Sequence, residues 1–404
     1  MEQKLLRGLG GPAHFPLGQR LLHQKHNLAD LYVCRTSAIA SPFTGLSCKT
    51  IFRHCKLDAR HVEDARWSPR VNATLTYDES LHHTDQTTVP ELKDTVNLST
   101  SFTLPKWVDP FCRFSRPHTV VGTILGVISV SFAAIQSHHD ISLRFFVGLV
   151  QALVPAVLIN IYVVGINQVI DVEIDKVNKP YLPLASGEFS LNTGISLSIL
   201  CATLSFCLGG LVGSKPLMCA LFLAYLIGTC YSLELPLLRW KRWGVSAAIS
   251  ILFVRAIVLQ VCIFLHMQSS VFGRIASLNK PVTFLISIMC IFSSIVAVFK
   301  DIPDLEGDKV HGINSYAVRL GPRPVFWFCI YVLTAAYVIT IFVGLSSKFT
   351  WTRICAVFGH CIVVSLLWHY ANKVDIKDKS SITDFYMFIW KLLYTEFFLA
   401  QFIR

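Results

Sequence analysis

The stretch FFVGLVQALVPAVLINIYVVGINQVI, from Phe145 to Ile170, contains no charged residue and is followed directly by DVEIDKVNKP, from Asp171 to Pro180. The uncharged run is longer than the roughly 20 apolar residues that a helix needs to cross the hydrocarbon of a bilayer. The acids therefore begin where such a helix reaches the membrane surface. This stretch predicts a membrane-spanning helix that ends in a polar motif.

The same alternation of long apolar runs and short charged loops continues along the chain. Four more charge-free runs are long enough to cross a bilayer, at 189–214, 281–299, 324–347 and 354–372. Weaker candidates are 120–136, 216–233, 244–267, which holds Arg255, and 385–402, which Lys391 and Glu396 interrupt. We therefore predict an all-α, polytopic membrane protein of about nine transmembrane helices.

The composition agrees with a membrane protein and argues against a nucleic-acid partner. The 404 residues are 53% hydrophobic and 15% charged, with a mean hydropathy of +0.53, whereas soluble domains are roughly 25% charged. The net charge is +11, but an excess of Lys and Arg in loops between apolar runs usually reports membrane orientation. The lipid bilayer is thus an expected partner, and we expect no binding of nucleic acid.

The first part of the chain differs in character from the rest. Residues 1–60 carry nine Lys or Arg against three acids, with scattered hydroxyl residues and no long apolar core. This composition is typical of an organelle transit peptide, plastid rather than mitochondrial, with a disordered cytosolic tail as the alternative. We predict a plastid transit peptide and disordered linker over 1–85, a linker over 86–108 and a membrane domain over 109–404.

Two acidic motifs occupy equivalent positions after the second and sixth predicted spans. In the first motif, Asn167, Asp171 and Asp175 lie at i, i+4 and i+8, which places three oxygen-bearing side chains on one face of a helix. The second motif, KDIPDLEGDK from Lys300 to Lys309, repeats the i, i+4 spacing at Asp304 and Asp308. Because both motifs follow even-numbered spans, we expect them on the same side of the membrane.

Acids gathered in this way favour a cation between them. Facing carboxylates repel each other unless a cation lies between, and Mg²⁺ binds through a few carboxylates, waters and phosphate oxygens. A diphosphate would supply the remaining oxygens. The alternative without a function is a set of solvated acids in loops. Two acidic motifs at the edge of the hydrocarbon favour a functional site instead. The candidate metal ligands are Asn167, Asp171, Asp175, Asp301, Asp304 and Asp308.

A diphosphate also needs positively charged donors, and basic residues flank both motifs. Arg255 is a special case, because a cation in the middle of a span needs an interior acid or an anionic ligand, or else a purely structural partner. For Arg239 and Lys241, a role as a topology signal explains the sequence equally well. The candidate diphosphate-binding residues are Asn167, Lys176, Lys179, Arg239, Lys241, Arg255 and Lys309.

At these residues the chain resembles the UbiA superfamily of intramembrane prenyltransferases, over about residues 109–404. Its N-x-x-x-D-x-x-x-D and D-x-x-x-D motifs match, and the sequences NQVIDVEIDKVNKPYLPLASGE and KDIPDLEGDK resemble the plant homogentisate and aromatic prenyltransferases in particular. The resemblance implies nine helices around a central, lipid-accessible cavity in a plastid membrane, with Mg²⁺ as cofactor. It also implies catalytic roles for Asp171, Asp175, Asp304 and Asp308.

The function expected from this resemblance is transfer of a prenyl group from an allylic diphosphate (dimethylallyl, geranyl or longer) to a plant phenolic. A coumarin or flavonoid is the preferred acceptor. The alternatives are homogentisate phytylation in tocopherol synthesis and prenylation of a chlorophyll or haem side chain. A more remote alternative is a non-enzymatic cation transporter, which would carry polar residues through several spans rather than at one membrane edge.

Overall fold

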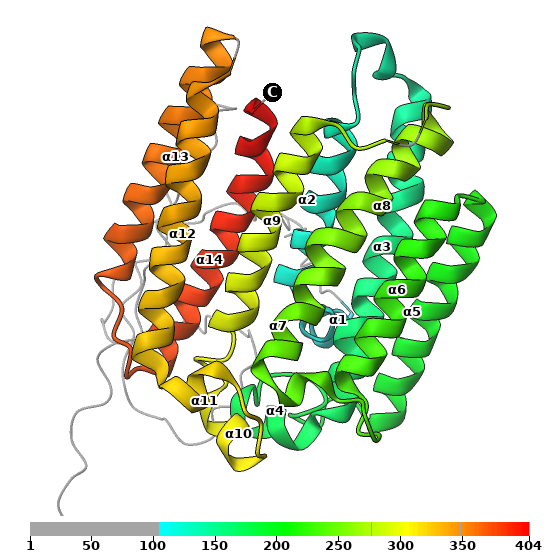
Figure 1. Ribbon diagram of the computed structural model, residues 1–404. Helices are drawn as coiled ribbons and strands as arrows, with labels where there is room; N and C mark the ends of the chain where they lie inside the picture. The colour runs from blue at the N-terminus through cyan, green and yellow to red at the C-terminus, as the bar shows by residue number, and fades with distance from the viewer. Residues whose placement is uncertain (1–104, 276, 348, 404) are drawn as a thin grey trace, which may run out of the picture. The chain divides into compact units, whose positions relative to one another are not determined.

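The computed structural model describes residues 105–403, apart from positions 276 and 348 (Figure 1). The predicted transit peptide and almost all of the predicted linker over 86–108 lie outside these residues. Within the described residues the chain folds into helices joined by turns, with no strand. The all-α class predicted from the sequence is confirmed.

Each of the nine predicted spans is helical in the described part of the chain. Seven helical segments are long and apolar enough to cross a membrane, whereas α2 is somewhat short and α14 carries Asp384, Lys391 and Glu396. The helices that match predicted spans are α2 (Pro117–Ala133), α3 (Leu143–Ile170), α5 (Leu191–Val212), α6 (Lys215–Ser232), α7 (Gly244–Leu252) with α8 (Leu259–His266), α9 (Lys280–Phe299), α12 (Pro322–Leu345), α13 (Thr350–Ala371) and α14 (Lys379–Leu399).

The local sequence explains where several of these helices begin. The Ser190 hydroxyl accepts a hydrogen bond from the Thr193 N–H at 3.1 Å, and the Asn279 Oδ1 accepts one from the Val282 N–H at 2.9 Å. Each capping oxygen pairs a backbone donor that the first turn leaves without a partner. Pro216 and Pro281 follow in the first turns of α6 and α9, where a missing N–H costs nothing.

The fifth span contains two wide π-helical turns, η3 (Phe253–Val258) and η4 (Met267–Val271), before and after α8. The first of them, with the sequence FVRAIV, contains Arg255. Such turns are rare and are found frequently at functional sites, because they shift the side chains of one turn relative to a regular helix. The π-helical turn η3 therefore sets the direction in which Arg255 points.

Short helices gather at one end of the long ones. Helices α4 (Val172–Asn178), α10 (Leu305–Val310) and α11 (Tyr316–Leu320) lie at the same end in Figure 1, and the chain's C-terminus lies at the opposite end. Helix α4 packs against α10. The two acidic motifs, which are more than 130 residues apart in the sequence, are thereby brought together.

The packing has a dry interior and an apolar exterior. Large side chains such as Phe264, Phe292 and Phe326 are fully buried, while Leu211 and Phe358 are exposed on the outer faces of their helices. A helix satisfies its own backbone hydrogen bonds, so a bundle of helices tolerates lipid on its outer surface. The exposed apolar faces fit a multi-pass membrane protein.

Candidate active site

The first acidic motif spans the break between α3 and α4. Helix α3 ends at Ile170, Asp171 is the residue between the two helices, and Asp175 lies one turn into α4. The Asn167 amide donates a hydrogen bond to Asp171 Oδ2 at 2.8 Å. The predicted i, i+4 relation between Asn167 and Asp171 is therefore present as a direct contact.

The second motif is held against the first by a close contact at Gly307. The Gly307 N–H in α10 donates to Asn178 Oδ1 at the end of α4, at 2.9 Å. A Cβ added to Gly307 would lie 2.5 Å from Asn178 Nδ2, closer than atoms approach. The pair of Asn178 and Gly307 thus sets the distance between the two motifs.

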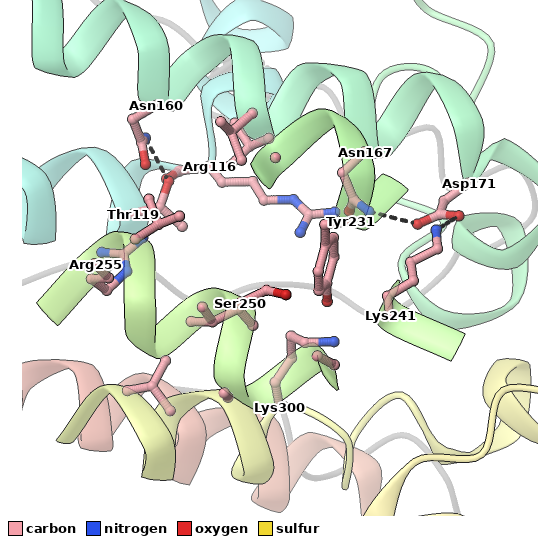
Figure 2. Close-up of a pocket in the computed structure, with 18 of the residues that line it drawn as sticks. Arg116, Thr119, Asn160, Asn167, Asp171, Tyr231, Lys241, Ser250, Arg255 and Lys300 are labelled. Carbon is pink, nitrogen blue, oxygen red and sulfur yellow. Dashed lines mark hydrogen bonds and ion pairs between the residues drawn. The ribbon is translucent and has the colours of Figure 1, made fainter. Parts of the chain in front are cut away.

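The carboxylates of both motifs line one cavity of about 200 Å³. Figure 2 shows Asp171 of the first motif beside Asn167 and Lys241 in this cavity. Asp171, Asp175, Asp301, Asp304 and Asp308 all line it, and each is buried. Buried acids are costly unless positive charge compensates them. The sequence prediction that the two motifs form one acidic site agrees with this geometry.

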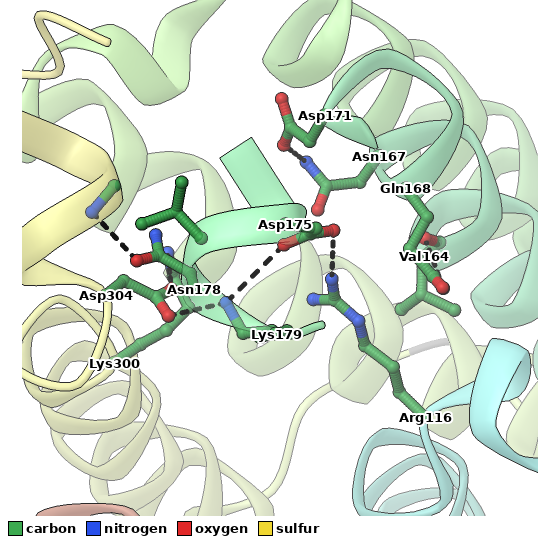
Figure 3. Close-up of polar contacts among 12 residues, drawn as sticks. Arg116, Val164, Asn167, Gln168, Asp171, Asp175, Asn178, Lys179, Lys300 and Asp304 are labelled. Atoms are coloured by element: carbon green, nitrogen blue, oxygen red, sulfur yellow. Dashed lines mark hydrogen bonds and ion pairs between the residues drawn. The ribbon is translucent and has the colours of Figure 1, made fainter. Parts of the chain in front are cut away.

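Lys179 lies between the two motifs (Figure 3). Its Nζ is 2.5 Å from Asp304 Oδ1 and 3.8 Å from Asp175 Oδ1. On the other side of Asp175, Arg116 Nη2 approaches Oδ2 at 3.5 Å. One lysine therefore links acids from the two motifs in the place where a shared cation would also be attracted.

Two further lysines complete the basic set. Lys300 Nζ lies 3.4 Å from Asp301 Oδ1 and 3.7 Å from Asp304 Oδ2, and Lys241 forms a buried ion pair with Asp171. The loop that holds Lys241 is tied to the segment after the second motif, since the Asn314 N–H donates to the Arg242 carbonyl at 2.9 Å. Lys241, which is buried, and Lys179 and Lys300, which are partly buried, thus meet the acids of both motifs.

The burial of these groups shifts their proton affinities. Burial raises the pKa of Asp175 and of Asp301, and it raises the pKa of Asp308 to about 6. Burial acts in the same direction on Asp304, but the charges of Lys179 and Lys300 outweigh it and hold the pKa of Asp304 below its usual value. Asp304 is therefore the best stabilised anion of these four.

Some of the predicted basic residues do not reach the cavity. Lys176 is half exposed and pairs with Glu173 at 2.7 Å, because it lies on the outer face of α4. Lys309 is exposed, and Arg239 pairs with Glu234 in the loop before Lys241. Among the described residues that line the cavity, Lys176, Arg239 and Lys309 are absent, whereas Lys179, Lys241 and Arg255 are present.

Other cavity residues were not among the candidates named from the sequence. Arg116 sits in FSRPHT, directly before Pro117 at the start of the first span. A basic residue at that boundary is the only signal for it, and the sequence contains many such residues. Tyr231 and Asn178 also line the cavity. Lys300 flanks the second motif, so its position beside the acids did provide a signal.

The oxygen donors around the cavity fit a hard cation. Asp175 Oδ2 is buried and accepts no hydrogen bond, although Arg116 forms a longer ion pair with it at 3.5 Å. Carboxylates and the Asn167 carboxamide are the ligand types that Mg²⁺ prefers. In the described part of the chain no three acidic, His or Cys side chains already form a metal cluster, and the Lys179 ammonium lies between the motifs instead.

In the described part of the chain, seven apolar helices able to span a membrane and a buried site of paired acids and bases define a polytopic membrane protein with a centre for anionic, metal-bound ligands. Residues 121–392 match the UbiA prenyltransferase family. This chain belongs to that family. It is an aromatic prenyltransferase, which transfers a prenyl group to an aromatic acceptor.

Relatives with several acceptors are similar over the membrane domain. Homogentisate phytyltransferase 1 of Arabidopsis thaliana is 52% identical over 297 residues, covering 74% of this chain and 76% of the relative. Homogentisate geranylgeranyltransferase of Hordeum vulgare is 47% identical over 73% of this chain and 72% of its own length. Coumarin 8-geranyltransferase 1 of Citrus limon is 39% identical over 77% of both chains.

The fold is shared with a solved archaeal structure. A UbiA homologue from Archaeoglobus fulgidus bound to GPP and Mg²⁺ has a TM-score of 0.51 and 17% identity, covering 72% of this chain and 99% of that one. At this level of identity the likeness establishes the fold. The predicted arrangement of helices around a central cavity is therefore confirmed.

Proposed function

We propose that this enzyme transfers a phytyl or similar long prenyl group from its diphosphate to homogentisate. The observation that carries the proposal is the gradient of identity, from 52% with a homogentisate phytyltransferase to 41% with a naringenin dimethylallyltransferase and 39% with a coumarin geranyltransferase. A coumarin or flavonoid acceptor, preferred from the sequence, is not confirmed. Homogentisate, named there as the alternative, has the better support.

In this proposal the two motifs hold the donor's diphosphate through Mg²⁺. Asn167, Asp171 and Asp175 would bind the cation on one side, and Asp301, Asp304 and Asp308 would bind it on the other. Two structures of the Archaeoglobus fulgidus homologue, one with GPP and one with DMAPP, contain Mg²⁺, which supports a divalent cation here. Bound Mg²⁺ supplies charge neutralisation of the leaving diphosphate.

The chain's own cations would complete the binding of the donor. Lys179, Lys241 and Lys300 already lie against the acids, so each is within reach of a diphosphate that takes the place of a carboxylate contact. As the allylic C–O bond breaks, its electron pair stays with the diphosphate, whose growing charge these ammonium groups stabilise. A ring carbon of the acceptor then forms the new C–C bond and loses its proton.

The apolar part of the cavity protects the reactive carbon. Ile159, Val163, Ile251 and Val254 line the cavity with side chains that carry neither a charge nor a hydrogen-bonding group. An allylic cation held against such walls meets no water that would capture it. These walls also offer space for the isoprenoid chain of the donor.

The test is an assay of the recombinant protein in membranes with a matrix of substrates. Phytyl, geranylgeranyl, geranyl and dimethylallyl diphosphates are each combined with homogentisate, naringenin and a hydroxycoumarin, with and without EDTA. We expect the highest kcat/KM for homogentisate with a long-chain donor, and no product with EDTA. A higher kcat/KM for naringenin or the coumarin would replace homogentisate with a specialised phenolic.

The proposed compartment is a plastid membrane. The Arabidopsis and rice relatives are named as chloroplastic proteins, and this chain has seven segments in its described part that are able to span a membrane. The basic segment over residues 1–85 would act as the transit peptide. Its structure lies outside the described residues, so this assignment rests on composition.

A further inference from the structure

Arg255 is a cation in the cavity wall for which the described residues provide no acidic partner. It lies in the π-helical turn η3, and its guanidinium stacks over the Trp390 ring at 4.9 Å from the ring centroid. No ion pair or hydrogen bond joins it to a side chain among residues 105–403. A cation–π contact offsets only part of the cost of burying a cation, so much of the charge of Arg255 remains uncompensated in a membrane interior.

Arg255 lies away from Asp171 and Lys241, two of the residues proposed to hold the donor's diphosphate. Figure 2 shows Arg255 beside Thr119, on the far side of the view from Asp171 and Lys241. Along the fifth span, Arg255 follows Gly244 by 11 residues, which is about 16 Å at the helical rise of about 1.5 Å per residue. Since Lys241 precedes that span, Arg255 lies well inside the membrane while the acidic motifs lie at its edge.

The residues around Arg255 form a small polar and aromatic subsite. His118, Thr119, Asn160, Tyr386 and Trp390 line the cavity there. The Asn160 amide donates to Thr119 Oγ1 at 3.0 Å, and the His118 ring packs edge-on against Trp390 at 5.1 Å. These aromatic rings offer walls for a flat ligand, and the amide and hydroxyl groups offer hydrogen bonds to its substituents.

A close contact with α2 fixes the position of the guanidinium. A Cβ added to Gly122 would lie 3.1 Å from Arg255 Nη1 and 2.8 Å from Trp390 Cζ3. Because Gly122 lacks this atom, Arg255 and Trp390 lie directly against the α2 backbone. The planar fork of the guanidinium is therefore preorganised, which suits two parallel hydrogen bonds to a carboxylate.

We propose that Arg255 binds the carboxylate of an aromatic acid, and so selects acceptors that carry an acidic side chain. This inference rests on the proposed function, because homogentisate is an aromatic acid whereas naringenin and simple coumarins have no carboxylate. With its carboxylate on Arg255, the acceptor's ring extends along the cavity toward the acidic motifs, where the allylic carbon of the donor lies. Arg255 is then a binding and specificity residue, distinct from the residues that hold the diphosphate.

The experiment compares Arg255→Met and Arg255→Lys in purified, folded protein. In Arg255→Met we expect the KM for homogentisate to rise about 10- to 100-fold, the range for a lost hydrogen-bonded charge. The KM for the prenyl diphosphate stays within about twofold. Arg255→Lys gives an intermediate KM, because it keeps the charge and loses the fork.

Arg274→Met is the matched control. Arg274 follows the same span and also stacks on an aromatic ring, with its guanidinium 4.7 Å from the Phe272 centroid, but it pairs with Asp140 and does not line the cavity. We expect both KM values of this variant to equal those of the unmodified enzyme. An unchanged KM for homogentisate in folded Arg255→Met, or a rise in the KM for the diphosphate instead, would overturn the assignment.

A second readout uses the unmodified enzyme and so does not depend on the folding of a variant. Phenylacetate, which has the carboxylate but no phenolic hydroxyl, should inhibit competitively with homogentisate, and the methyl ester of homogentisate should bind at least about tenfold more weakly. Equal binding of acid and ester would refute the role of Arg255. If the enzyme fails to prenylate homogentisate at all, the proposed function fails instead, and the two failures are thus distinguished.

Discussion

At the scale of single residues, the site depends on which acids face the cavity. We expect Asp171→Ala and Asp304→Ala each to reduce kcat/KM by far more than tenfold, because each removes a buried carboxylate proposed to bind Mg²⁺. A tenfold loss corresponds to only about 1.4 kcal/mol of transition-state stabilisation. Turnover per folded protein in membranes is the measurement.

Helices α4 and α10, which begin directly after Asp171 and Asp304, provide matched controls for these variants. Glu173 in α4 and Glu306 in α10 are carboxylates that point away from the cavity, with 72% and 75% of their side chains exposed. Glu173→Ala and Glu306→Ala should retain nearly full activity. Activity above a tenth of the unmodified rate in either aspartate variant would remove that aspartate from the metal site.

The raised pKa of Asp308 predicts a pH dependence of metal binding. Burial raises this pKa to about 6, so below that pH the Asp308 carboxyl is neutral and must lose a proton before it binds Mg²⁺. The apparent Mg²⁺ affinity should fall about tenfold for each pH unit below about 6. Asp175 and Asp301, whose pKa values burial also raises, should steepen the fall.

The measurement for this prediction is the Mg²⁺ concentration at half-maximal rate, titrated between about pH 5 and about pH 8. Asp308→Asn should weaken Mg²⁺ binding at the upper end and reduce the slope at the lower end, because its amide does not titrate. A Mg²⁺ affinity that is constant down to about pH 5 would show that Asp308 is not a ligand.

At the scale of the elements, the site depends on the contact between α4 and α10. Gly307→Ala places a methyl group 2.5 Å from the Asn178 amide, so the two helices must move apart or the Asn178 side chain must turn away. We expect lower Mg²⁺ affinity and at least about a tenfold loss of kcat/KM, since a displacement of about 1 Å at a site is costly. Activity and Mg²⁺ titration of the purified variant are the measurements.

Gly210→Ala is the control for this prediction. Gly210 lies in α5, and no atom lies within 4 Å of a Cβ added there. Ala in an exposed helix position is favourable by up to about 1 kcal/mol relative to Gly, so activity and stability should be kept or improved. If both variants behave alike, the close approach of α4 and α10 is not what aligns the motifs.

The sequence pattern predicts the helices of this chain but not every side chain that enters the site. The spans are predictable from runs of apolar residues of the right length. Helical spacing likewise predicts that Asn167, Asp171 and Asp175 lie on one face. The choice between Lys176 and Lys179 does not follow from spacing, because it depends on where α4 ends. Helix α4 stops at Asn178, and Lys179 leaves it with φ −141° and turns toward Asp304.

The sequence pattern also does not predict contacts between residues that are distant in the chain. Arg116 lies 59 residues before Asp175, and nothing in the local pattern of FSRPHT indicates that its guanidinium approaches that carboxylate. The contact of Arg255 with Trp390 joins residues 135 positions apart. Such contacts are set by the packing of α2, η3 and α14, which local periodicity does not encode.

At the scale of the whole molecule, we propose from composition that the chain divides into a basic leader and a membrane domain. We predict that deletion of residues 1–85 spares catalysis and abolishes organelle import, because the leader is basic and has no apolar face for packing. A fusion of residues 1–85 to a fluorescent protein should enter plastids. A diffuse cytosolic signal, or a loss of turnover in the truncated enzyme, would contradict the division.

The position of Lys179 bears on the stability of the enzyme in the absence of Mg²⁺. Because the Lys179 ammonium links Asp175 to Asp304, it offsets part of the negative charge of both motifs whether or not a cation is bound. Chelation should therefore stop turnover without unfolding the protein, and added Mg²⁺ should restore the rate within the time of mixing. A newly inserted chain would thus complete its fold in a compartment poor in magnesium and become active when the ion arrives with the donor.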